Sequence, residues 1–304
     1  MKHTHLGILG PNVNLDFFKY TRIFFGAAAI LLIASLSYPF VKGYNLGIDF
    51  KGGIVIDFIN NANDPLDTIR EKLDSLGVKD YSIKEFGSNG FQLEISQSEL
   101  PKEKVNDIIE SIKVAMSGYS LLQVQFVGPS VSADLLKSGL LATFFSLIGM
   151  FVYIWIRYNW QFGLIGVLTL IHDALMSLLF LSIFHFEVNV SSIAAILTVI
   201  AYSINDTVVL FDQVRENTRK YIKEDVKFII NKSINQVLSR SIATVMTVVL
   251  VLLSIFFLGG DTLKSFSFTL LVGVLFGAYS SICLSVPMLY YIGDIKAREL
   301  AKGK

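Results

Sequence analysis

The sequence predicts a polytopic α-helical membrane protein with six transmembrane helices and one small extracytoplasmic α+β domain. Hydrophobic residues make up 53% of the 304 residues and charged residues only 17%, whereas soluble domains carry about 25% charged residues. Six apolar runs approach or exceed the length of about 20 residues that a helix needs to cross a bilayer. A mixed polar and apolar segment of about 90 residues separates the first run from the rest.

The first run covers residues 17–38, so we assign 1–16 to a cytoplasmic segment and 17–41 to the first transmembrane helix. A cleaved signal peptide is the alternative, since 27–29 are small residues. The apolar stretch continues through 30–34, which is too long for the hydrophobic region of a signal peptide. We therefore expect an uncleaved helix that carries the next segment out of the cytoplasm.

The segment 42–131 has the pattern of a small soluble domain. Expected strands cover 53–59, 81–86, 91–95 and 121–127, a hairpin turn lies at 87–90, and expected helices cover 65–76 and 101–116. Asp64 and Pro65 mark the start of the first helix, as an N-cap followed by proline at the first helical position. The resulting β-α-β-β-α-β order predicts a ferredoxin-like domain.

The remaining membrane part, 132–293, contains the other spans, at 135–156, 162–184, 188–211, 242–258 and 266–292. The long connection 212–238 is basic, with Arg215, Arg219, Lys220, Lys223, Lys227 and Lys232. The opposite connections, 185–188 and 259–264, carry only Lys264. The positive-inside rule therefore places 212–238, the tail 294–304 and both termini in the cytoplasm.

Asp206 interrupts the fourth span, and a carboxylate within hydrocarbon costs several kcal/mol. Ser203, Asp206, Thr207 and Leu210 fall on one side of a helix, so this polar stripe must face protein or water. The plainer alternative is that Asp206 lies at the cytoplasmic rim or is a protonated hydrogen-bonding residue.

Arg240 comes to a similar depth as Asp206 if the fourth and fifth spans form an antiparallel hairpin, and Thr244 continues its stripe. Pairing would lower the cost of burying both charges. A carboxylate that alternates between paired and protonated forms suits a proton relay. A fixed ion pair that merely docks two helices remains the alternative.

Three further features lie in or near the spans. The candidates for the proton path or for a helix contact are His172, Asp173, Ser203, Thr207, Asp212 and Thr244. Asp212 is expected at the membrane edge, paired with Arg215 at i+3. Gly273 and Gly277 form a GxxxG pattern that predicts close helix packing.

Several functional classes find no support in the sequence. It has no nucleotide-binding glycine motif, no cysteine or histidine spacing for a metal site, and no serine or cysteine nucleophile set. Cys283 is the single cysteine, so no disulfide forms within the chain. A net charge of +1 does not indicate nucleic-acid binding. We therefore expect no enzyme, no metal and no cofactor.

Several motifs together resemble the SecF family over essentially the whole chain. They are Gly47-Ile-Asp49-Phe50-Lys-Gly52-Gly53, Phe126-Val-Gly-Pro-Ser130, the stretch 202–212 with Arg215-Glu-Asn217, Leu238-Ser-Arg-Ser241, and 276–282 with Pro287. The resemblance implies a bacterial inner-membrane subunit that works with SecD beside the SecYEG channel. It also implies that unfolded secretory polypeptides are its substrates and that protons are its coupling ion.

By the same resemblance, Asp206 and Arg240 would be proton-pathway residues. One alternative function is half of a proton-driven small-molecule exporter of the similar resistance–nodulation–division class. A purely structural membrane scaffold is another alternative, but that role would not explain why Asp206 lies within a transmembrane span.

Overall fold

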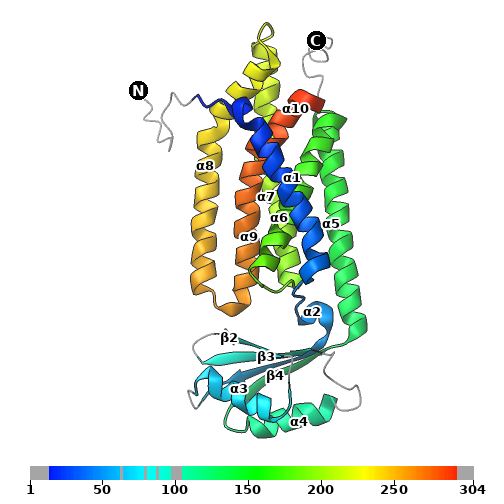
Figure 1. Ribbon diagram of the computed structural model, residues 1–304, viewed down its shortest axis with the longest axis vertical. Helices are drawn as coiled ribbons and strands as arrows, with labels where there is room; N and C mark the ends of the chain where they lie inside the picture. The colour runs from blue at the N-terminus through cyan, green and yellow to red at the C-terminus, as the bar shows by residue number, and fades with distance from the viewer. Residues whose placement is uncertain (1–13, 62–63, 79–80, 87–88, 97–104, 293–304) are drawn as a thin grey trace.

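The computed structural model describes residues 14–61, 64–78, 81–86, 89–96 and 105–292. Figure 1 shows a bundle of long helices with a small sheet domain packed at one end. Six helices in the described part are long and apolar enough to span a membrane, in agreement with the six predicted spans. They are α1 (Phe17–Lys42), α5 (Pro129–Arg157), α6 (Trp160–Ile183), α7 (Val190–Lys220), α8 (Val226–Leu258) and the continuous run of α9 (Asp261–Tyr279), η3 (Ser280–Ser285) and α10 (Val286–Ile292).

The connection between α7 and α8 is much shorter than the sequence predicts. The predicted loop 212–238 is mostly helical, and only residues 221–225 join the two helices. Charged side chains do not end a helix that leaves the bilayer, so hydropathy marks where the apolar stretch stops rather than where the helix stops. α8 consequently has 33 residues, although the sequence makes its span the shortest.

The small domain has the predicted order of strands and helices: β1 (Gly53–Ile59), α3 (Leu66–Ser75), β2 (Tyr81–Phe86), β3 (Gly90–Ser96), α4 (Val105–Ala115) and β4 (Ser120–Val127). Its sheet has the strand order β2-β3-β1-β4. All three neighbouring pairs are antiparallel, with Ile56 opposite Leu93 on one side and Val124 on the other.

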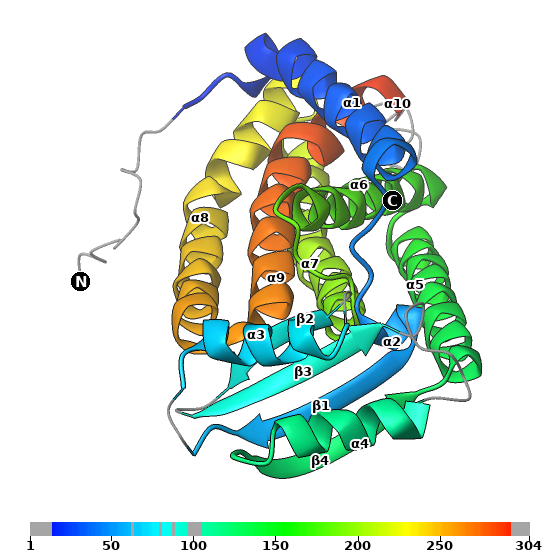
Figure 2. The same cartoon turned by 60° about the horizontal axis from the view of Figure 1, so that its bottom comes forward.

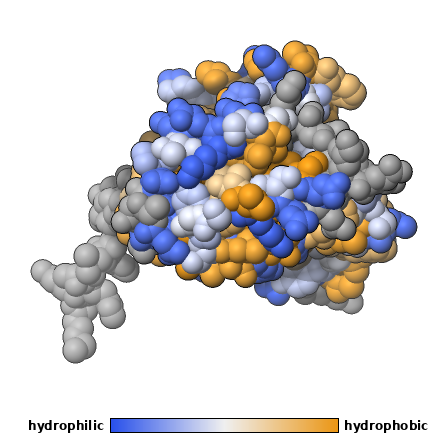
Figure 3. All heavy atoms as spheres, turned by 90° about the horizontal axis from the view of Figure 1, so that it is seen from below, coloured by the Kyte–Doolittle hydropathy of each residue, from blue (hydrophilic) through white to orange (hydrophobic). Residues whose placement is uncertain are grey.

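Successive side chains of β1 point to opposite faces of this sheet. Ile54, Ile56 and Phe58 point to the side of α3 and α4, where they are buried with Ile69 and Ile112. Figure 2 shows these two helices on the side of the sheet turned away from the bundle. The outer surface of the domain mixes hydrophilic and apolar side chains (Figure 3), and the other face of the sheet is turned toward the bundle.

Two details of this domain differ from the prediction or lie beyond it. Pro65 is the N-cap residue of α3 rather than its first helical residue. Asp64 does not cap the helix with its side chain, because its carboxylate accepts hydrogen bonds from Tyr119 and Lys72. The tip of the hairpin at 87–88, the expected start of the second helix at 101, residues 1–13 and the tail 294–304 lie outside the described residues.

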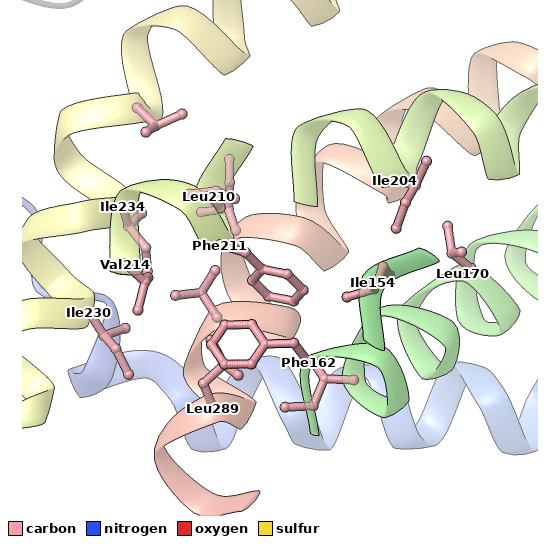
Figure 4. Close-up of a cluster of buried hydrophobic side chains, with 14 of the residues drawn as sticks. Ile154, Phe162, Leu170, Ile204, Leu210, Phe211, Val214, Ile230, Ile234 and Leu289 are labelled. Atoms are coloured by element: carbon pink, nitrogen blue, oxygen red, sulfur yellow. The ribbon is translucent and has the colours of Figure 1, made fainter. Parts of the chain in front are cut away.

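Aromatic side chains pack together at the end of the bundle where α7 and α8 are connected. The rings of Phe162 and Phe211 meet edge to face at 4.9 Å, an arrangement that aromatic pairs favour. Figure 4 shows these rings among Ile154 from α5, Ile234 from α8 and further apolar side chains. α7 therefore packs against several other helices at once, and its polar side chains are enclosed with its apolar ones.

Candidate functional site

The polar stripe predicted on α7 is buried inside the bundle. Ser203, Thr207 and Leu210 have at most 1% of their surface exposed, and Asp206 has 7%. The Oδ2 atom of Asp206 is buried and has no hydrogen-bond partner among the described residues. An unpaired carboxyl oxygen in such a place is costly, which marks Asp206 as a candidate functional group.

Asp173 is the centre of a second polar group, which joins three helical segments. Its side chain is completely buried. Its Oδ2 atom accepts hydrogen bonds from Ser203 of α7 at 2.6 Å and from Ser280 of η3 at 2.8 Å. Its Oδ1 atom lies 3.0 Å from Nδ1 of the neighbouring His172. We call His172, Asp173, Ser203 and Ser280 the Asp173 cluster.

A further hydroxyl pair extends this contact along α7. The hydroxyl groups of Thr207 and Ser281 lie 2.8 Å apart, and both residues are fully buried. α7 therefore contacts η3 directly through Thr207, and one turn earlier it is linked to η3 through the carboxyl of Asp173. The polar side chains of the α7 stripe thus form hydrogen bonds mainly with α6 and η3.

The predicted glycine pattern packs α9 closely against α7. A methyl group at Gly273 would overlap the γ carbons of Val199, and one at Gly277 would lie 3.1 Å from Cβ of Ser203. The same methyl group at Gly277 would lie 3.6 Å from Oδ2 of Asp173. Gly277 therefore leaves the room in which Ser203 reaches Asp173, so helix packing and the polar contacts depend on each other.

The predicted pairing of Asp206 with Arg240 is not present in this conformation. The two residues are equally far from the α7–α8 connection, as expected, but within the described chain no ion pair joins them. Arg240 acts on Asp206 electrostatically without contacting it. Arg240 and Thr244 are exposed on the outside of the bundle. The depth was predicted correctly, but the rotation of α8 about its axis was not.

The predicted partner of Asp212 is also wrong. Asp212 pairs with Arg157 at the end of α5, at 2.8 Å, and accepts a hydrogen bond from the hydroxyl of Tyr158 at 2.8 Å. Arg215 instead donates to the backbone carbonyl of Arg157. Arg215 was the nearest basic residue in the sequence, but Arg157 of α5 lies closer to the Asp212 carboxylate in the folded chain.

The motif 47–53 forms the joint between the bundle and the sheet domain. Ile48–Lys51 is a single helical turn, α2, and contains Phe50. Asp49 accepts a hydrogen bond from the backbone N–H of Val190, at the start of α7, and the N–H of Gly47 donates to the carbonyl of Val188. Gly52 and Gly53 have positive φ angles of 75° and 150°, which a residue with a side chain adopts only with strain.

Lys84 ties the sheet to the same end of the bundle. Its ammonium group lies 2.6 Å from Glu94 in the neighbouring strand and 2.5 Å from Glu187 in the α6–α7 connection. These groups line a cavity of about 200 Å³, together with Asp49 and Asp261. Burial disfavours the charged amine, but the two carboxylates outweigh this and hold the pKa of Lys84 above its ordinary value.

Replacing Lys84 with methionine should loosen the docking of the sheet domain. The change leaves Glu94 and Glu187 close together without a cation, which costs about 3 kcal/mol. Because the pKa of Lys84 is raised, its contribution is present at neutral pH and is lost only as the pH rises beyond the ordinary lysine value. Hydrogen–deuterium exchange should become faster in β2 and in residues 184–189. Lys72→Met, at the half-buried Asp64 pair, should leave these segments unchanged; equal protection in both variants would contradict the docking role.

Sequence reasoning missed the docking residues and one member of the Asp173 cluster. Lys84 and Glu187 are ordinary charged residues in a strand and a short loop, and no sequence pattern connects them. Ser280 was noted only as part of the family motif 276–282. Its position three residues after the GxxxG pattern was the available signal, but the π-helical turn that directs it to Asp173 is a tertiary feature.

Six membrane-length helices, a docked antiparallel sheet and acidic residues buried between helices define a polytopic membrane protein with polar groups inside its bundle. The family model "Protein export membrane protein SecD/SecF, C-terminal" matches residues 107–294. The SecF subunit of the protein translocase of Rickettsia felis is 38% identical over 296 residues, covering 96% of both chains. That of Rickettsia prowazekii is 37% identical and covers 97% of both.

Solved structures give the same result. The crystal structure of SecDF, a translocon-associated membrane protein from Thermus thermophilus, matches with a TM-score of 0.78 at 28% identity. That match covers 92% of this chain but only 39% of the SecDF chain. A super-membrane-facing form of SecDF matches with a TM-score of 0.71. The chain therefore belongs to the SecD/SecF family of protein-export membrane proteins, and its curated relatives are SecF subunits.

Proposed function

We propose that this chain is the SecF-type subunit of a Sec protein translocase. Together with SecD it would use the proton-motive force to promote export of unfolded proteins that emerge from the SecYEG channel in a bacterial inner membrane. Family membership supports the export function. The observation that carries the coupling to protons is the buried carboxyl oxygen of Asp206, which lies in a membrane-length helix and has no hydrogen-bond partner in the described part of the chain.

In this proposal Asp206 takes up and releases the coupling proton. An isolated carboxylate in a low-dielectric interior favours its neutral form, whereas a nearby cation favours the charged form. Arg240 is such a cation, and it remains charged under all relevant conditions. Movement of Arg240 toward or away from Asp206 would therefore switch the carboxyl group between ionised and protonated forms.

SecD is the partner that we expect to cover an exposed polar stripe on α8. Arg240, Thr244 and Thr247 are exposed in this chain alone. An arginine facing lipid is costly, and charged residues in transmembrane segments face protein or a water-filled cavity. We infer that a membrane segment of SecD covers this stripe, as the single-chain SecDF architecture of the matched structure suggests.

We further propose that the sheet domain is a ferredoxin-like domain outside the cytoplasm. Its strand order and antiparallel pairing support the fold, and the basic end of α7 and α8 supports the orientation. β4 is an edge strand with exposed Leu122 and Phe126, so it offers backbone and apolar contacts to an emerging polypeptide.

Reconstitution tests the function directly. Vesicles that contain SecYEG, SecD and this chain should complete the late stage of translocation faster when a proton gradient is imposed. Vesicles that lack this chain should show no gradient effect. Equal stimulation with and without the chain would exclude the proposed role.

The orientation predicts a pattern of cysteine labelling. In a Cys283→Ser background, a cysteine at Lys72 should react with a membrane-impermeant maleimide in intact cells, and one at Lys223 should react only after the membrane is opened. The basis is the excess of lysine and arginine near Lys223. Labelling of position 223 from outside would reverse the topology.

A further inference from the structure

Besides Asp206, the bundle holds a second buried acidic group that the proposed relay does not use. Asp173 has no exposed surface, and His172 has 3%. Three hydrogen-bonding groups converge on the Asp173 carboxyl: the hydroxyls of Ser203 and Ser280 and the Nδ1 atom of His172. They come from α6, α7 and η3, which lie in the interior of the bundle.

Hydrogen bonding and burial act in opposite directions on the Asp173 carboxyl: the bonds favour its ionised form, and complete burial favours its neutral form. A carboxylate that accepts several hydrogen bonds is stabilised in its ionised form. With Nδ1–H of His172 directed at Oδ1, both carboxyl oxygens have donors. In this arrangement the other ring nitrogen of His172 carries a lone pair.

That second nitrogen has no partner. Nε2 of His172 is buried and makes no hydrogen bond to any described residue. With neutral imidazole and ionised Asp173, the pair carries a net charge of −1 inside the bundle. A proton on Nε2 makes the pair neutral overall and removes the cost of a buried net charge.

We propose that His172 and Asp173 form a second proton-binding site, separate from Asp206, and that Ser280 transmits its occupancy to the π-helical turn Ser280–Ser285. The proton binds at Nε2 of His172, and Asp173 is the counter-ion that makes binding favourable. Binding itself does not depend on the proposed function; only its use in export rests on that function.

The geometry provides the route of transmission. Ser280 is the first residue of η3, and its hydroxyl lies within reach of two acceptors, the carboxylate of Asp173 at 2.8 Å and the carbonyl of Gly277 at 3.2 Å. A neutral pair attracts the hydroxyl less than a charged one, so protonation shifts Ser280 toward its own helix. π-helical turns are rare and are often found at functional sites.

The other end of the cluster leads to Asp206. Ser203 precedes Asp206 by three residues on α7, and Thr207 contacts Ser281 in η3. Tyr279 is a titratable group beside the pair, and its ring centre lies 6.2 Å from that of His172. Cys283 of η3 in turn lies near Tyr279. The hydroxyl of Tyr279 donates to the carbonyl of Phe24, which leaves Nε2 free.

Histidine NMR tests the proton site. The chain has only four histidines, so the ring signals of His172 are identified by their loss in His172→Gln. In nanodiscs with the intact chain, these signals should change with pH as the His172–Asp173 pair gains a proton. Asp173→Asn should remove this response. Absence of a response in the unaltered chain, or an unchanged response in Asp173→Asn, would overturn the proposal.

Cys283 allows a separate test of the transmission, because the only cysteine lies inside η3. A trifluoromethyl tag on Cys283 should show a ¹⁹F shift that follows the titration of His172. Ser280→Ala should abolish the ¹⁹F response but keep the titration. Ser267→Ala, whose hydroxyl bonds only within α9, should keep both. A ¹⁹F response that persists in Ser280→Ala would refute the transmission step.

These readouts separate this inference from the proposed function. Asp206→Asn should leave the titration of His172 intact, even if gradient-driven translocation is lost. If gradient-driven translocation survives Asp206→Asn while His172 still titrates, the relay through Asp206 fails and the second site stands.

Discussion

Asp206→Asn is expected to reduce proton-gradient-stimulated translocation to the level seen without a gradient, while the chain remains folded. Asparagine has the same size but cannot take up and release a proton. Because Oδ2 of Asp206 has no hydrogen-bond partner among the described residues, the change removes no contact at that atom. A proton that crosses the membrane releases about 2.3 kcal/mol per 100 mV, and this energy would no longer be coupled to export.

The measurement is late-stage translocation into inverted vesicles, with and without an imposed gradient. Arg240→Met should have a similar effect, because Asp206 would stay protonated without a cation to favour its charged form. Thr244→Val should be much milder, since the hydroxyl of Thr244 donates to backbone carbonyls of its own helix and carries no charge. Asp212→Asn is the matched control: it removes a carboxylate at the end of the bundle, outside the α7 stripe. Full stimulation in Asp206→Asn would exclude the relay.

Gly273→Ala is expected to destabilise the helix bundle more than alanine substitution at any exposed helical glycine. The added methyl group would overlap Val199 and lie 2.8 Å from the hydroxyl of Ser177. Overpacking of this kind costs about 1–3 kcal/mol. A loss of about 2 kcal/mol corresponds to a melting temperature lowered by roughly 4–8 °C.

Gly149→Ala provides the matched control, because nothing lies within 4 Å of a methyl group at that helical position. Alanine favours a helix over glycine by up to about 1 kcal/mol, so this variant should be unchanged or slightly more stable. Thermal unfolding of both variants in the same detergent, followed by size-exclusion chromatography, gives the comparison. Equal melting temperatures would show that α9 and α7 adjust without cost.

Both predictions concern α7 and the helices packed against it. Gly277 of α9 leaves room for Ser203 beside Asp173, and Asp206, which forms no ion pair with a described residue, lies one turn further along α7. Close packing makes such a contact respond in discrete steps rather than by gradual deformation. A change of charge between these helices is therefore well placed to change how they pack.

The sequence by itself determined which segments enter the membrane and which polar residues go with them. Long apolar runs are forced into the bilayer by their hydration cost, and this cost depends only on composition. The same reasoning identified Asp206 as a candidate functional residue, because a carboxylate within an apolar run is costly whichever groups it contacts. Turn residues and alternating side chains were enough to predict the order of strands and helices in the small domain.

Only the tertiary structure decided which polar groups meet. Loop length sets the depth of a residue along a helix, so Asp206 and Arg240 were correctly placed level with each other. The rotation of a helix about its axis is set by packing of all its apolar residues: α8 buries Val237, Ser241 and Val245 and turns Arg240 outward. Contacts such as Asp173 with Ser280 depend on that rotation in several helices at once, and the π-helical turn adds a local change that no periodic pattern contains.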